Sequence, residues 1–446
     1  MSIHLLNIIC TFYLATLARC DASRRSFQHS YTPGGVRDKH DGQSIGTHVF
    51  GESIPLLSSR TDLIRHNRVH NSYEHEVMFV IRQNNMDELT RVLHDVSDPS
   101  SPNYGQHWTK DEVVALTANL EGRDAVTSYL QSKRASVIST SAGGEYVIAK
   151  ACTSVWEAVF NTEFYTFHQT QSTGSIKKVV RAEKYWIPRE LETHIDSAFN
   201  VIDIPIPLFG NLPKSIPKPV SESNTLGSSF RYITPGVIRN YYNMSQRVTG
   251  SVLSTQATFA SIGQYLSPAD LNYFQTQQGL TVQPISKSYG NYTSNLQCVI
   301  DGNKCIESNL DIQYIMGISQ ISPTTYWYTD SDFSSWLFAV ANTMNPPLVL
   351  SISYGQSEQY TSYSELNTFN NEAIKLGAMG VSIFVASGDN GANSPYVQVN
   401  GVSSCGYSPS FPATCPYVTS VGATSVKMCR VIFYSVQFYH SRLLLY

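Results

Sequence analysis

The sequence predicts an α/β fold with a parallel sheet in its second half, preceded by a smaller α+β domain. Two short, almost wholly apolar runs, 348–353 and 381–385, are typical of strands in a sheet that is covered on both faces. A helical pattern at 364–376 lies between them, and strands that alternate with helices predict parallel pairing. The length of 446 residues favours two domains rather than one.

The first domain is predicted to end near residue 202. The alternation of Val77, Phe79 and Ile81 indicates a strand, and apolar residues over 89–96 recur at helical spacing. Residues 109–112 form a capping box, which opens a helix. A strand at 145–151 and a helix starting at 154–157 are also predicted in this domain. In the second domain, a strand at 324–328 and a helix at 332–344 are predicted.

The two ends of this first domain are predicted to be irregular. Residues 1–20 have a short apolar run followed by small residues, which indicates a signal peptide. Residues 21–72 are polar and patternless, so we expect a flexible segment. Closely spaced prolines within 203–229 predict an interdomain linker that is accessible to processing proteases.

Composition narrows the class of protein. The net charge of -3 gives no basis for nucleic-acid binding, and no stretch beyond the signal is apolar enough to span a membrane. The glycosylation triplets at Asn243 and Asn291 agree with a soluble protein of the secretory pathway. Cysteines 298 and 305, and 405 and 415, are close enough to close small loops, although spacing leaves the connectivity open. No two cysteines have C-x-x-C spacing, so we expect no zinc site of that kind.

Three carboxylates are the candidate functional residues. Glu307 and Asp311 are four residues apart, so a helix would project both from one face. Asp389 follows the predicted strand at 381–385, and functional residues of parallel sheets gather at the carboxyl ends of strands. Taken alone, the pair is more typical of a solvated helix surface, and Ser387-Gly-Asp-Asn-Gly391 of a glycine-rich turn.

In combination these motifs resemble the sedolisin family of serine-carboxyl peptidases. The resemblance rests on Glu-x-x-x-Asp at 307–311, Ser-x-Ser-Tyr-Gly at 351–355 and Ser-Gly-Asp-x-Gly at 387–391. It extends to segments that look like the family's propeptide at 96–105, its mature start at 234–243 and the stretch after its oxyanion aspartate at 411–422. The similarity spans about residues 73–428 and is greatest to the lysosomal, tripeptide-releasing member of the family.

The resemblance implies a subtilisin-like parallel-sheet catalytic domain, incomplete here, preceded by a ferredoxin-like propeptide domain. The implied divisions are a signal peptide at 1–20, a flexible segment at 21–72, a propeptide domain at 73–202, a processing linker at 203–229, a catalytic domain at 230–428 and a non-homologous tail at 429–446.

The family's roles transfer to the matching positions. Glu307 would be the general base for a serine hydroxyl, and Asp311 would orient it. Asp389 would donate a hydrogen bond to the tetrahedral oxyanion, and a carboxyl donates only when it is protonated. The implied chemistry therefore suits an acidic compartment such as the lysosome, or an acidic site of secretion.

The nucleophile is the departure from the family pattern. The family's Gly-Thr-Ser-Ala motif does not occur in this sequence. Ser425 in Gly-Ala-Thr-Ser matches a non-catalytic segment of the relatives, so we expect no role for it as nucleophile. The family's calcium site also lies beyond the nucleophile, so calcium is expected for the family, but no metal ligand is assigned in this chain.

Two functions remain open. The first is an acid serine-carboxyl peptidase of the tripeptidyl-peptidase type, made as a proenzyme and acting on peptides or unfolded proteins; the chain as given lacks its nucleophile. The second is a catalytically inactive short form that binds substrate, or binds a full-length relative through residues 73–202. The apolar and aromatic tail from residue 429 looks like sequence read past an exon boundary, or like an alternative end.

Overall fold

The fold is taken from a computed structural model. It describes residues 44–170, 176–204, 233–244, 250–389 and 409–422, and the short strands at 398–399, 402–403, 426–427 and 430–431. The predicted signal peptide, residues 205–229 of the predicted linker and residues 432–446 of the predicted tail lie outside these ranges.

The first domain has the predicted α+β architecture. Its central antiparallel sheet has the strand order β10-β4-β6-β5, and helices connect β4 to β5 and follow β6. This is the order of a ferredoxin-like β-α-β-β-α-β unit. Its elements are β4 (Glu74–Ile81), α2 (Met86–Ser97), α3 (Lys110–Thr117), α4 (Leu120–Ser132), β5 (Ser136–Thr140), β6 (Tyr146–Cys152), α5 (Thr153–Phe160) and β10 (Ile195–Phe199).

Local sequence explains the start of α3 but not the start of α5. The predicted capping box is confirmed: the Thr109 side chain accepts from the Glu112 amide, and the Glu112 carboxylate accepts from the Thr109 amide at 2.7 Å. The helix predicted to start at 154–157 is present and begins at Thr153, but its N-cap residue, Cys152, makes no side-chain cap. That helix is instead held by burial of Trp156, Val159 and Phe160.

The prediction of a flexible segment up to residue 72 is wrong from Ser44 onwards. Strand β2 pairs with β9, and β3 pairs with β7, which also pairs with β8. The β2–β9 and β3–β7 pairings join residues 97 to 140 positions apart, so no local pattern reveals them. The additional elements are β1 (Ser44–Ile45), β2 (His48–Ser53), η2 (Leu57–Ser59), β3 (Leu63–Arg68), β7 (Phe164–Thr170), β8 (Ile176–Ala182) and β9 (Lys184–Pro188).

The second domain is built on a six-stranded parallel sheet, as predicted. Its order is β12-β13-β11-β14-β16-β20, and all the adjacent pairs are parallel. The strands are β11 (Gln256–Ala260), β12 (Lys287–Tyr289), β13 (Thr324–Tyr328), β14 (Val349–Ile352), β16 (Ser382–Ala386) and β20 (Thr419–Val421). The predicted strand at 324–328 is reproduced residue for residue.

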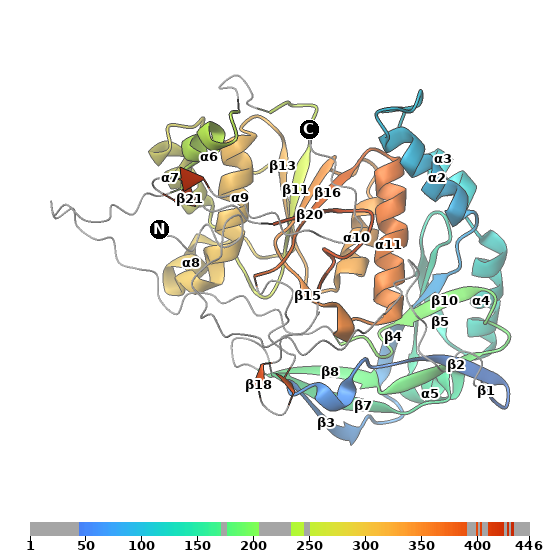
Figure 1. The fold of residues 1–446 in the computed structure, drawn as a ribbon. Helices are drawn as coiled ribbons and strands as arrows, with labels where there is room; N and C mark the ends of the chain where they lie inside the picture. The colour runs from blue at the N-terminus through green and yellow to red at the C-terminus, as the bar shows by residue number, and fades with distance from the viewer. Residues whose placement is uncertain are drawn as a thin grey trace, which may run out of the picture.

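Helices lie on both sides of this sheet (Figure 1). They are α6 (Pro235–Tyr241), α7 (Pro268–Gln277), α8 (Asn295–Ile300), η3 (Gly302–Cys305), α9 (Ile306–Ile318), α10 (Phe333–Ala341), η4 (Glu358–Tyr360) and α11 (Tyr363–Ala378). Short strand pairs join β15 (Gln356–Ser357) to β19 (Ser410–Phe411), β17 (Gln398–Val399) to β18 (Val402–Ser403), and β21 (Val426–Lys427) to β22 (Arg430–Val431).

Each side of the sheet has its own core. Helices α10 and α11 pack on one face through residues such as Trp336 and Phe369, whereas α7 and α9 cover β11 and β13 on the other through Leu271 and Ile312. The second core does not reach β16, whose residues alternate between buried and exposed, with Phe384 38 % exposed. The prediction that 381–385 is covered on both faces is therefore wrong among the described residues.

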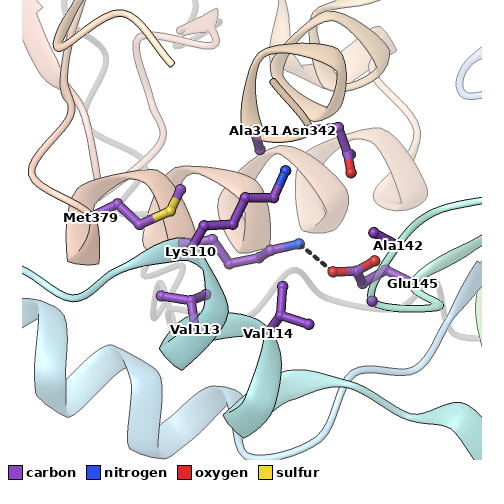
Figure 2. Close-up of a pocket in the computed structure, with 10 residues that line it drawn as sticks. Lys110, Val113, Val114, Ala142, Glu145, Ala341, Asn342 and Met379 are labelled. Atoms are coloured by element: carbon purple, nitrogen blue, oxygen red, sulfur yellow. Dashed lines mark hydrogen bonds and ion pairs between the residues drawn. The ribbon is translucent and has the colours of Figure 1, made fainter. Parts of the chain in front are cut away.

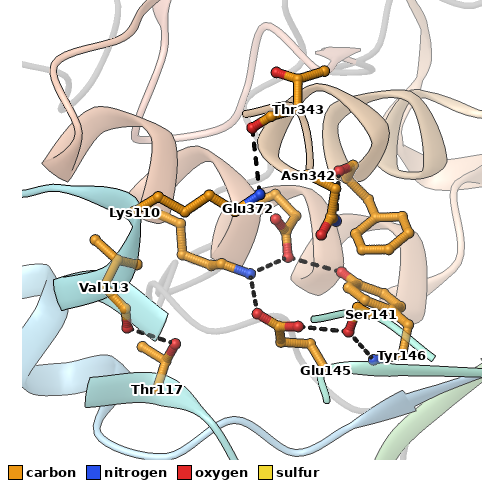
Figure 3. A network of polar contacts seen from close by, with 11 residues as sticks. Lys110, Val113, Thr117, Ser141, Glu145, Tyr146, Asn342, Thr343 and Glu372 are labelled. Atoms are coloured by element: carbon orange, nitrogen blue, oxygen red, sulfur yellow. Dashed lines mark hydrogen bonds and ion pairs between the residues drawn. The ribbon is translucent and has the colours of Figure 1, made fainter. Parts of the chain in front are cut away.

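The two domains meet along α11. A buried polar network crosses the contact: the Lys375 ammonium donates to Glu372 Oε1 at 3.0 Å and to Glu145 Oε1 at 3.3 Å, and the Tyr146 hydroxyl donates to Glu372 Oε1 at 2.8 Å (Figure 3). Lys110 lies beside it and donates to the Thr343 carbonyl at 3.3 Å. A small cavity between the domains is lined by these two lysines and Glu145 (Figure 2).

Charge balance holds this network together. Burial disfavours the ionised form of Glu145, but Lys375 and the Ser141 hydroxyl outweigh burial and hold the pKa of Glu145 below its usual value. Burial likewise opposes the charge on Lys375, but Glu372 and Glu145 raise the pKa of its ammonium. The first domain thus supplies one of the two carboxylates that neutralise a buried lysine of the second.

We predict that Lys375→Met at neutral pH lowers the free energy of unfolding by about 3–5 kcal/mol, because two buried carboxylates lose their cation. Denaturant unfolding measures this loss. Lys110→Met is the matched control, and we expect it to cost only about 1 kcal/mol because it removes a bond to a backbone carbonyl. Equal small losses for both variants would contradict a stabilising role for the network.

Candidate active site

Helix α9 holds two of the predicted site residues. Its buried residues Ile312 and Met316 pack on the sheet, and Glu307 and Asp311 lie one turn apart in its first half. Both residues are half-buried, but Glu307 Oε1 and Asp311 Oδ2 are inaccessible to solvent. The pair is therefore not the solvated helix surface that either residue alone would suggest.

Asp389 is brought toward this pair by the sheet. It comes three residues after the end of β16, at the carboxyl edge of the parallel strands. Gly388 before it has a φ of 93°, a left-handed conformation that L side chains rarely adopt, which explains the glycine in this turn. Asp389 is half-buried, and its charge is one of those that act on Glu307.

A serine supplies a hydrogen bond to one member of the pair. The Ser353 hydroxyl, just after β14, donates to Asp311 Oδ1 at 2.7 Å. Among the described residues, Glu307 Oε1 and Asp311 Oδ2 have no hydrogen-bond partner. Sequence reasoning misses this role of Ser353, and the signal that points to it is the Ser-x-Ser-Tyr-Gly motif at 351–355.

The pKa values of all three carboxyls are raised above their usual values. Burial, then the charges of Asp311 and Asp389, raise the pKa of Glu307 well above its usual value. Burial raises the pKa of Asp311 to about 7, against the opposing effect of the Ser353 hydrogen bond. Burial also raises the pKa of Asp389.

This arrangement can hold and exchange protons in acid. Two close carboxyls cannot both ionise easily, so they titrate as a coupled pair. A carboxyl of raised pKa accepts a proton at mildly acidic pH, as a general base does, and a protonated carboxyl such as Asp389 donates a hydrogen bond to developing negative charge. The geometry supports general acid–base chemistry below neutral pH.

Other predicted sites have different outcomes. Asn243 and Asn291 are exposed, as an acceptor asparagine must be, while Ser425 lies outside the described residues. The close pair Cys298 and Cys305 forms a disulfide with a Cα–Cα distance of 5.6 Å. Cys415 is buried, and Cys405 lies outside the described residues.

No metal or membrane element is found in the part of the chain that the structure describes. There, no group of three or more His, Cys, Asp or Glu residues is placed so that it could hold a metal ion. Within the same residues, no helix has the length and apolar character needed to cross a bilayer.

Comparisons with known proteins find similar sequences for both halves of the chain. Residues 61–201 match the family model "Pro-kumamolisin, activation domain", which begins inside the segment predicted to be flexible. Aorsin of Aspergillus oryzae is 26 % identical over 86 % of this chain and 69 % of its own length. Tripeptidyl-peptidase 1 of Rattus norvegicus is 29 % identical over 81 % of this chain and 63 % of its own length. The chain thus spans about two thirds of these curated relatives.

A search of solved structures gives a Pseudomonas sedolisin, a serine-carboxyl proteinase complexed with two molecules of pseudo-iodotyrostatin. It is 22 % identical, with a TM-score of 0.34, over 44 % of this chain and 54 % of that chain.

We predict that the free energy of unfolding falls as pH rises from about 4 to about 7, and that Asp311→Asn reduces this fall by about 1–3 kcal/mol. A raised pKa in the folded state favours folding while the group is protonated and loses that contribution as pH passes through the folded-state pKa, here about 7. Denaturant unfolding at several pH values measures the effect. Asp87→Asn, at an exposed position of α2, is the control, and an identical pH slope in all three proteins would contradict the raised pKa.

Proposed function

This chain belongs to the sedolisin family of serine-carboxyl peptidases, and from that premise we propose that it derives from an acid peptidase that releases N-terminal tripeptides. One observation carries the proposal: on one turn of α9, Glu307 and Asp311 each have an inaccessible carboxylate oxygen with no hydrogen-bond partner among the described residues, within the electrostatic reach of Asp389. Burying such groups is costly, and functional sites are where that cost is found.

In the proposed reaction each carboxyl has a separate role. Glu307 takes the proton of a serine nucleophile as that serine attacks the peptide carbonyl, and returns it to the leaving amine. Asp311, held by Ser353, orients Glu307. Asp389, protonated in acid, donates to the oxyanion of the tetrahedral intermediate. The raised pKa values of all three suit operation below pH 7.

Whether the 446-residue chain can itself hydrolyse peptides depends on a serine nucleophile. The Gly-Thr-Ser-Ala motif is absent from the sequence, so we propose that this chain is inactive as it stands. Tripeptide release is proposed from the name of one group of relatives, tripeptidyl-peptidase 1, and peptides or unfolded proteins are the proposed substrates.

The activation domain and the disulfide indicate how the protein is made. We propose a proenzyme in which residues 61–201 cover α11 until they are removed at the linker. The Cys298–Cys305 disulfide requires an oxidising compartment, which supports passage through the secretory pathway to the lysosome or to the outside.

A second candidate is an inactive binding form. The absent motif and the buried Glu145–Lys375 contact favour it, because an activation domain that docks on α11 of its own chain presents a surface for α11 of a relative. In this role the chain would inhibit a full-length peptidase rather than cleave peptides.

We predict no turnover of an Ala-Ala-Phe fluorogenic amide near pH 4 by the acid-treated, folded chain. The same assay is run on Glu307→Gln and on Glu121→Gln, an exposed position of α4. Turnover that is lost in Glu307→Gln and kept in Glu121→Gln would show that another serine completes the site, and would contradict the inactivity proposed here.

A second arm of this assay separates the two candidates. The chain is added to rat tripeptidyl-peptidase 1 turning over the same amide. Slowed hydrolysis that Glu145→Gln relieves would favour the inhibitory form, because that substitution removes the carboxylate that the activation domain brings to its contact with α11. Unchanged hydrolysis would exclude it.

A further inference from the structure

The turn that follows β11 contacts the start of the helix that bears Glu307. Gln264 in this turn is only 6 % exposed, and both ends of its side-chain amide are bonded. Its Oε1 accepts from the Glu307 backbone N–H at 3.1 Å, and its Nε2 donates to the Asn303 carbonyl at 3.1 Å. The two bonds together fix which end of the amide faces the helix.

Helix α9 needs this acceptor because its own N-cap residue supplies none. The first backbone N–H groups of a helix have no partner within the helix and require an outside acceptor. Cys305 is the N-cap residue, and its sulfur is in the disulfide and makes no side-chain cap. Gln264 therefore takes the place of a capping side chain, from a strand end 43 residues earlier in the sequence.

Further bonds fix the residues on both sides of Glu307. The Tyr265 amide donates to the Lys304 carbonyl at 2.6 Å. The Tyr326 hydroxyl donates to the Gln264 carbonyl at 2.7 Å and lies 2.9 Å from the Ser308 hydroxyl. The position of the Glu307 backbone is thus set by the turn after β11.

We propose that Gln264 is a positioning residue that holds the first turn of α9 so that the Glu307 carboxyl stays buried beside Asp311. The proposal rests on the function proposed for Glu307. Its carboxylate has an oxygen without a hydrogen-bond partner among the described residues, so side-chain bonds contribute little to its placement and the backbone contact dominates. Loosening this turn lets Glu307 move toward solvent.

Hydrogen exchange read by mass spectrometry on the full chain tests this contact. Gln264→Met keeps the side-chain volume and removes both bonds, and we expect amide exchange in the first turn of α9 to become at least about tenfold faster. Gln275→Met is the matched control, because Gln275 is equally buried and bridges Gln283 through both ends of its amide, away from Glu307. We expect it to leave exchange at the start of α9 unchanged.

A pH profile separates positioning from a merely structural role. The free energy of unfolding is measured against pH for each protein and for the same protein carrying Glu307→Gln. The difference between the two curves is the pH dependence that Glu307 contributes. In Gln264→Met we expect the midpoint of this difference to move toward the usual glutamate range, by about tenfold in proton affinity, as the carboxyl gains solvent. In Gln275→Met we expect no movement.

Unchanged exchange and an unchanged midpoint in Gln264→Met would overturn the proposal, as would equal changes in Gln275→Met. If Gln264→Met does not fold, Tyr326→Phe removes the bond to the Gln264 carbonyl, and several-fold faster exchange in the same turn is expected; unaltered exchange would overturn it. Neither readout needs turnover, so failure here is distinct from failure of the proposed peptidase function.

Discussion

The rest of the site depends on one constraint: two carboxylates of α9 are placed where water does not reach their inner oxygens. Removing a carboxylate from water without full hydrogen bonding is costly, and the cost appears as the raised pKa values of Glu307 and Asp311. The parallel sheet makes this placement possible, because its carboxyl edge brings the ends of β11, β14 and β16 to one side. Gln264 follows β11 and holds Glu307. Ser353 follows β14 and holds Asp311. Asp389 follows β16 and adds the third carboxyl.

The same balance between burial and charge recurs at the contact between the domains, with the opposite result. There Glu145 is buried beside Lys375, which holds its pKa below the usual value, so the contact favours the ionised carboxylate. Falling pH protonates Glu145 and weakens that contact, whereas it favours the folded form of the Glu307–Asp311 pair. The two regions therefore respond to falling pH in opposite directions, and the contact weakens only below the usual glutamate range, because the pKa of Glu145 is lowered.

Much of this architecture follows from local sequence. Helical spacing alone put Glu307 and Asp311 on one face, and the strand at 324–328 and the capping box at Thr109 were found where they were predicted. The errors concern contacts between distant segments. Strands β2 and β3 each have two adjacent apolar residues rather than an alternating pattern, and they pair with the distant strands β9 and β7. Ser353 and Gln264 contact their partners across 42 and 43 residues, and no periodicity encodes such pairs.

The most direct test of the account is a carboxyl titration by carbon-13 NMR with glutamate labelled at Cδ, in the native chain and in Glu307→Gln. The account predicts one glutamate signal that titrates well above the ordinary glutamate value of about 4.3 and disappears in Glu307→Gln, because burial and the neighbouring aspartates disfavour its ionisation. If the signal lost in Glu307→Gln titrates in the ordinary range, the carboxyl is solvated, and the buried pair on which the account rests does not exist.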